Sequence, residues 1–93
     1  MKPLYLQLRR GFFLAVLAGE KRIEYRDASP HYDRMLSRPY DAVRFRNGYS
    51  PRAPEMVVAV RRIRKRGAMW CIYLGTIISI NDETRAMLRK EEK

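Results

Sequence analysis

Two long strand patterns, separated by only a few residues, constrain the fold of this chain more than any other feature. Glu55 to Lys65 begins with the apolar run Met56 to Val60 and ends in a basic segment, and Trp70 to Ile80 is mostly apolar. Runs rich in β-branched and aromatic residues are typical of strands, and Gly75 predicts a bend or bulge in the second one. Because 93 residues have room for one hydrophobic core, every other element must share it.

Shorter elements follow from the spacing of apolar residues in the rest of the chain. Alternation of apolar and polar side chains predicts strands over residues 3–8, 21–27 and 42–46. Helical spacing, with Gly19 after one segment and Ser29-Pro30 opening the next, predicts helices over residues 10–18 and 30–37. Asn81-Asp82 can cap a last short helix, whose end from Arg89 to Lys93 is expected to fray.

This order of elements predicts an α+β fold. Strands that alternate with two short helices and are then followed by three strands close most economically as a small, mostly antiparallel β-barrel, with both helices at its flanks. We expect residues 1–80 to form this domain and residues 81–93 to form a charged C-terminal helix or tail. Neither an internal repeat nor a linker is visible.

The charge of the chain indicates a polyanionic partner. Twenty lysines and arginines against ten acidic residues give a net charge of +10, while 46% hydrophobic residues indicate a folded body and not a disordered polyelectrolyte. Net charge alone does not separate RNA, DNA and an anionic membrane. Nucleic acid is favoured, because no long basic amphipathic helix and no segment of membrane-spanning length is present.

Cysteine and histidine are too scarce for the common metal sites. Cys71 and His31 are the only residues of their types, so a zinc site built from them would leave at least two ligand positions to oxygen donors. We therefore expect no structural metal and no cofactor. A single cysteine also fits a reducing compartment, and we expect the protein to be cytoplasmic.

The densest basic run lies at the end of the first long strand pattern. Within Arg61 to Arg66, alternation along a strand would direct Arg62, Arg64 and Arg66 to one side, where they can follow a phosphate backbone. The alternative is a solvated strand end whose charges protect a sheet edge. Five charges exceed what an edge needs, which favours backbone binding.

A second cluster of polar residues follows the pattern G-x-K-x-x-E-x-R from Gly19 to Arg26. Lys21 and Arg26 can hold a phosphate, and Glu24 can accept protons from a base edge or activate water. Tyr25, Tyr32 and Tyr49 offer stacking surfaces for unpaired bases. In the alternative, Glu24 and Arg26 form an exposed ion pair of little energetic value and Tyr25 lies in the core. The residues alone leave both interpretations open.

The same segment resembles the ASCH domain family, small barrels related to the PUA RNA-binding fold. The resemblance continues through Ser29 to Tyr32, Phe45 to Tyr49 and Tyr73 to Ile77, in order along residues 4–80. It implies a PUA-like barrel with an RNA-binding cleft lined by the motif. The nucleic-acid-binding residues that we predict from the motif, from the loop after the middle strand and from the basic run are Lys21, Glu24, Arg26, Arg46, Asn47, Tyr49, Arg62 and Arg64.

Two alternatives to a binding protein stay open. Some ASCH relatives are amidohydrolases of 4-acetylcytidine and others are proposed ribonucleases, so the chain is also a candidate hydrolase of RNA or of a modified nucleoside. In that case Lys21 and Glu24 would be the catalytic residues. A basic protein-interaction module is the third interpretation, and binding of acidic proteins without binding of nucleic acid would support it.

We predict that the chain does not efficiently deacetylate 4-acetylcytidine. The relatives that do so resemble this chain but have a threonine where it has Glu24, and they use a glutamate from a late strand. Here residues 70–80 contain no carboxylate, so both the hydroxyl nucleophile and the late acid are missing. Cytidine release from 4-acetylcytidine, followed by chromatography, measures the activity.

Turnover in the usual enzyme range of roughly 1 to 10³ per second would contradict this prediction. Release that disappears in Glu24→Gln would then identify Glu24 as a carboxylate that activates water.

Overall fold

A computed structural model describes residues 1–91 and places them in five strands and three helices. These elements are, in chain order, β1 (Pro3–Gln7), α1 (Arg10–Leu17), β2 (Ile23–Asp27), α2 (Pro30–Leu36), β3 (Ala42–Arg46), β4 (Glu55–Arg66), β5 (Met69–Ile80) and α3 (Asp82–Glu91). Each predicted element is present, with bounds within two residues of the predicted ones. Of the segment that was expected to fray, residues 92–93 lie outside the described residues.

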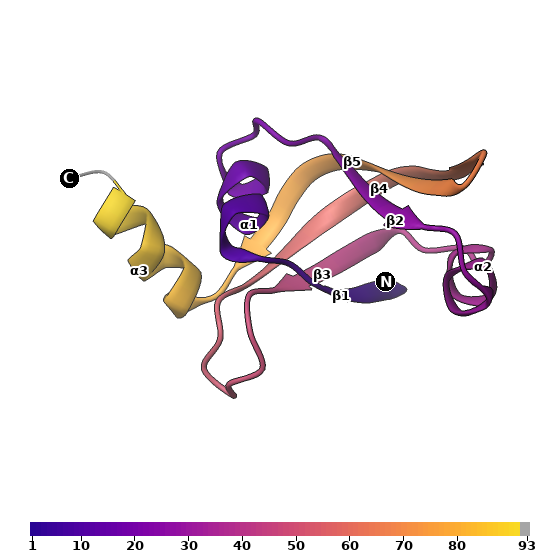
Figure 1. Cartoon of the computed structure of the whole chain (residues 1–93). Coiled ribbons are helices and arrows are strands. Elements are labelled where there is room, and N and C mark those ends of the chain that lie inside the picture. The colour runs from indigo at the N-terminus through magenta and orange to yellow at the C-terminus, as the bar shows by residue number, and fades with distance from the viewer. Residues whose placement is uncertain (92–93) are drawn as a thin grey trace.

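All five strands belong to one mixed sheet in the order β1-β3-β4-β5-β2. The β1–β3 pair is parallel and the other three pairs are antiparallel, which confirms a mostly antiparallel α+β fold. The sheet curls into a half-barrel, with β1 and β2 at its two edges (Figure 1). The prediction of a closed barrel is therefore correct only in part, because no backbone ladder joins β1 to β2 within the described sheet.

Irregular pairing between β4 and β5 bends the sheet. The register shifts at three places between Val57 and Arg62, and residues 75–76 of β5 are accommodated opposite Ala59. Bulges of this kind bend a strand pair and increase its twist. At Gly75 a Cβ atom would lie 3.3 Å from side-chain atoms of both Ala59 and Arg61, so the missing side chain lets the strands approach closely. The bend predicted at Gly75 is confirmed.

One face of the sheet carries the core, and we call it the inner face. The helices cover this face by adding Phe13, Val16, Leu36 and Met87 to its buried cluster. The remaining buried members are Leu8, which directly follows β1, and the strand residues Leu4, Leu6, Val43, Phe45, Met56, Val58, Trp70, Ile72 and Leu74. The intervening strand residues point to the opposite, outer face, where Tyr5 and Tyr25 are 64% and 49% exposed.

The last helix is tied to the start of β4 through buried polar groups. Asn81 caps α3 by accepting a hydrogen bond from the Thr84 backbone at 3.0 Å, and its amide donates to the Ala53 carbonyl at 2.9 Å. Thr84 is fully buried, and its hydroxyl accepts from the Glu55 backbone N–H at 2.8 Å. These contacts fix α3 beside α1, at the end of the hairpin strands away from α2 (Figure 1).

At the other end of the molecule, α2 contacts the β4–β5 hairpin. Trp70 donates its indole N–H to Asp33 at 2.8 Å, and the Lys65 ammonium lies 3.1 Å from the same carboxylate. The Trp70 and Lys65 hydrogen bonds lower the pKa of Asp33. Among residues 1–91, no helix is both long enough and apolar enough to cross a bilayer.

Phe45→Ala tests how much of the stability rests on the inner face. The ring is completely buried, so its removal leaves a cavity and should cost about 3–5 kcal/mol of unfolding free energy. Thermal unfolding should then shift by roughly 4–8 °C per kcal/mol for a domain of this size. Tyr49→Ala is the control, because Tyr49 is 87% exposed. Equal melting temperatures for both variants would contradict this assignment of the core.

Candidate nucleic-acid interface

The charged pair of the G-x-K-x-x-E-x-R motif lies on the inner face of β2. Glu24 is only 5% exposed and Arg26 is partly buried, whereas Ile23 and Tyr25 point to the outer face. Glu24 pairs across the sheet with the buried core residue Ile72, which places both side chains on the same side. The alternative of an exposed ion pair with Tyr25 in the core is therefore wrong on both counts.

Glu24 and Arg26 are the centre of a hydrogen-bonded group that we call the seam network. Glu24 Oε1 lies 3.3 Å from Lys21 Nζ, and Glu24 Oε2 accepts from Arg26 Nε at 2.9 Å. Arg26 Nη1 donates to the Tyr32 hydroxyl at 2.9 Å, and Nη2 donates to the Gln7 carbonyl at 2.7 Å. Burial alone would lower the pKa of Arg26, but its contacts with Tyr32 and Glu24 outweigh burial and raise that pKa.

The seam network joins the two edges of the half-barrel. Gln7 ends β1 and Arg26 lies in β2, so the Arg26–Gln7 hydrogen bond crosses the gap that no strand ladder closes. The planar guanidinium suits this position because it donates in several fixed directions at once. Arg26 therefore has a structural role, whatever else it binds.

The candidates at the end of β3 and in the loop after it lie close to the same end of β1. The Asn47 amide donates to the Leu8 carbonyl at 2.9 Å, next to the Gln7 carbonyl that Arg26 uses. Arg46 donates to the Ser50 carbonyl at 2.8 Å. Arg46 and Asn47 thus support the loop, and Tyr49 stands exposed on it. The structure therefore places Asn47 next to the seam network, whereas the Tyr49 side chain extends into solvent.

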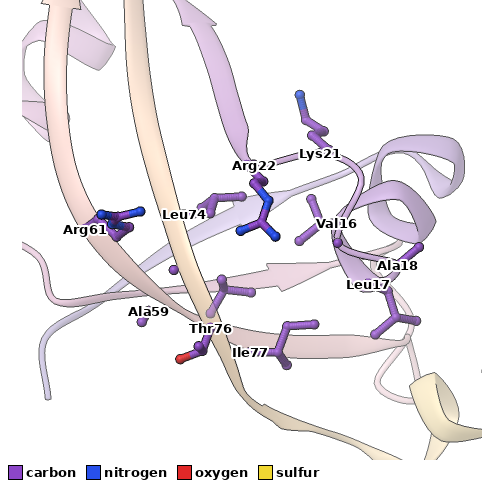
Figure 2. Close-up of a pocket in the computed structure, with 13 residues that line it drawn as sticks. Val16, Leu17, Ala18, Lys21, Arg22, Ala59, Arg61, Leu74, Thr76 and Ile77 are labelled. Atoms are coloured by element: carbon purple, nitrogen blue, oxygen red, sulfur yellow. The ribbon is translucent and has the colours of Figure 1, made fainter.

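A cleft of about 670 Å³ opens between α1 and the bulged part of the hairpin (Figure 2). It exists because the backbone contact with β5 ends at the hydrogen bond from the Leu74 N–H to the Arg22 carbonyl, so the next residues of β5 face α1 across a gap. Its walls are mainly apolar. The lining residues are Val16, Leu17, Ala18, Gly19, Lys21, Arg22, Val58, Ala59, Arg61, Leu74, Gly75, Thr76 and Ile77.

Three cationic side chains belong to this lining, and two of them were missed from sequence. Figure 2 shows Arg22 directed toward β5 and Lys21 directed away from it; Lys21 contacts Glu24 and lies 5.0 Å from the centre of the Phe12 ring. Arg61 is the extra residue of the bulge between Val60 and Arg62, which turns it out of the regular alternation. In the sequence, only the bulge predicted at Gly75 could have indicated that Arg61 leaves the alternation of β4.

Arg62 and Arg64 lie on the outer face, away from the seam network. Arg62 pairs across the sheet with Tyr73, and its guanidinium lies 4.5 Å from the centre of that ring. Arg64 pairs with Cys71. Glu24 and Arg26 face the other side of the same sheet, so the predicted binding residues divide between two surfaces.

The cleft offers mainly apolar and cationic groups to a ligand. Its lining contains no carboxylate, and Glu24 is already neutralised by Lys21 and Arg26. Thr76 supplies one hydroxyl. Among the described residues, no group of three or more histidine, cysteine or acidic side chains is placed to hold a metal ion.

Comparison with family models, with curated proteins and with solved structures finds no match for this chain. The ASCH resemblance therefore stays a prediction from the sequence.

Arg26→Lys tests the seam network. Lysine keeps the charge but cannot donate to Glu24, Tyr32 and the Gln7 carbonyl at the same time. At about 0.5–1.5 kcal/mol for each of two lost hydrogen bonds, unfolding free energy should fall by about 1–3 kcal/mol. Denaturant unfolding measures it, with the exposed Arg34→Lys as the matched control. Identical stability of both variants would exclude a structural role for Arg26.

Proposed function

We propose that this chain is an ASCH-type, PUA-like domain that binds single-stranded RNA in the cleft beside α1. The observation that carries the proposal is an apolar hollow of about 670 Å³ with Lys21, Arg22 and Arg61 in its lining. Apolar walls accept the faces of a base, and cations accept the phosphates attached to it. The motif resemblance supports RNA as the nucleic acid.

The shape of the cleft supports recognition of an unpaired base. Small-molecule pockets typically have volumes of roughly 300–1,000 Å³, so the cleft is large enough for a nucleobase. Beyond Leu74, the edge of β5 that faces the cleft has no strand partner among residues 1–91, and its backbone N–H and C=O groups can meet a base edge. A base becomes available for such contacts only where it is unstacked and unpaired.

Unneutralised charge on β4 supports a polyanionic ligand at this place. Arg61, Arg62, Arg64 and Arg66 are exposed, and none of them forms an ion pair with another described residue. Charges that remain unpaired create a positive potential that attracts phosphates and accelerates association. Arg61 connects this row to the cleft, because it belongs to both.

In this proposal the motif residues have different tasks. Lys21 lines the cleft, and Glu24 and Arg26 position it through the seam network. Binding is favoured over hydrolysis because Glu24 is held by two cations and does not line the cleft. Lys21 and Glu24, the catalytic candidates, are therefore proposed as binding and positioning residues.

The salt dependence of RNA binding tests this proposal. If about five phosphates are neutralised, log K against log salt concentration should have a slope near −3.5, from roughly −0.7 per contact on single strands. Arg22→Gln and Arg61→Gln should each weaken binding and make the slope shallower by about 0.7. Fluorescence anisotropy with a labelled oligouridylate measures both, with the exposed Arg38→Gln, just beyond the C-cap of α2, as the matched control.

A slope that does not change with either substitution would show that the cleft makes no phosphate contact. Equal affinity for oligouridylate and for the corresponding DNA strand would retain a nucleic-acid site but contradict the choice of RNA.

A further inference from the structure

We propose that the outer face of β2, β5 and β4 is a second contact surface for the same single strand, on which bases stack on Tyr73 and Tyr25. This inference rests on the proposed function, because the strand would continue from the cleft onto this face. The surface, which we call the platform, consists of Tyr25, Tyr73, Arg62, Arg64 and Arg66. Neither Tyr73 nor the outward position of Tyr25 was evident from the sequence.

The strand register places the two tyrosines of the platform diagonally to each other and the three arginines in a line along β4. Three rows cross the sheet, and they are Ile23–Tyr73–Arg62, Tyr25–Cys71–Arg64 and Asp27–Met69–Arg66. Residues paired in one row share a face, and those two apart along a strand are separated by about 7 Å, from a rise of 3.3–3.4 Å per residue. Tyr25 and Tyr73 are thus diagonal neighbours, and the arginines form a line beside them.

The Tyr25 ring is exposed, the Tyr73 ring is partly exposed, and each already contacts a cation. Tyr25 is 49% exposed, and the Lys21 ammonium lies 5.4 Å from its ring centre. Arg62 lies 4.5 Å from the centre of the Tyr73 ring. Between the two tyrosines, Cys71 is small and only 4% exposed, so the larger side chains around it form the surface. A ring and an adjacent guanidinium together offer a wide plane for base stacking.

A second hollow connects the platform to the cleft. It has a volume of about 470 Å³ and is lined by Arg22, Ile23, Arg61, Arg62, Tyr73 and Leu74. Three of these residues, Arg22, Arg61 and Leu74, also line the cleft. A strand that leaves the cleft therefore meets Arg22 and Arg61 at the passage and Tyr73 directly beyond it.

The composition of the platform favours a nucleic acid over other anionic partners. None of its arginines forms an ion pair with another described residue, so all three are free to contact a ligand of repeated negative charge. An acidic protein could contact the arginines and the tyrosines, but it does not supply a series of planar bases to stack on the two rings. A membrane surface would require exposed apolar side chains, whereas Ile23 and Met69 of these rows are only partly exposed. Alternating rings and cations fit alternating bases and phosphates.

Anisotropy titrations of Tyr25→Leu and Tyr73→Leu against a labelled oligouridylate test the platform. Stacking contributes roughly 1–3 kcal/mol per base, so each substitution should weaken binding by roughly 5- to 150-fold. The salt slope should stay unchanged, because no phosphate contact is lost. The same titrations with an abasic strand should show weaker binding by the unaltered protein and little effect of either substitution.

Two controls separate stacking from damage to the fold. Tyr5→Leu changes an exposed outer-face tyrosine on the distant edge strand β1 and should leave the affinity unchanged. Tyr25→Phe keeps the ring and should keep the affinity. If Tyr73→Leu lowers the melting temperature, the half-exposed Tyr25 alone decides the result.

Three outcomes would overturn the inference. If the unaltered protein binds and Arg22→Gln weakens binding, but Tyr25→Leu and Tyr73→Leu bind normally, the platform is excluded and the cleft is retained. Equal affinity for the abasic strand would exclude stacking. If the unaltered protein binds no oligonucleotide at all, the proposed function fails and the platform with it.

Discussion

The Arg26 guanidinium holds together a sheet that backbone pairing leaves open. β1 and β2 are the edges of the half-barrel, and Arg26 spans them by donating to Glu24 within β2, to Tyr32 in α2 and to the Gln7 carbonyl of β1. Glu24 makes this possible, because a partly buried cation without a counter-ion would be costly. Since Glu24 also binds Lys21, the position of the cleft's lysine depends on the same network.

The bulges between β4 and β5 shape the other side of the cleft. They bend the hairpin away from regular pairing and turn Arg61 out of the alternation, so that Arg61 joins the cleft and the second hollow. Gly75 allows this because a side chain there would meet Ala59 and Arg61 at 3.3 Å. The edge of β5 next to α1 therefore stays uncovered. Lys21 and Arg22 lie on one side of it, and Arg61 lies on the other.

The distribution of charge follows from this geometry. Three acidic residues have structural contacts: Glu24 binds Arg26 in the seam network, Asp33 accepts a hydrogen bond from Trp70, and Glu55 accepts one from Arg44. The hydrogen bond from Arg44 to Glu55 is the main cause of the raised pKa of Arg44. The arginines at the end of β4 have no such partner among the described residues. Part of the net charge of +10 therefore stays unneutralised on Arg61, Arg62, Arg64 and Arg66, beside the cleft and on the platform, where a polyanion would neutralise it.

The sequence by itself determined the order and bounds of the elements, the bend at Gly75 and the grouping of Lys21, Glu24 and Arg26, because apolar periodicity and short spacings are local properties of the backbone. It did not determine the open seam, nor that Glu24 faces inward while Tyr25 faces outward. Charged side chains on a strand are buried only when partners from other elements, here Gln7 and Tyr32, accept their hydrogen bonds. The meeting of Arg22 with Arg61, and the separation of Arg62 and Arg64 from the seam, were likewise decided by tertiary structure, since strand register sets which side chains share a face.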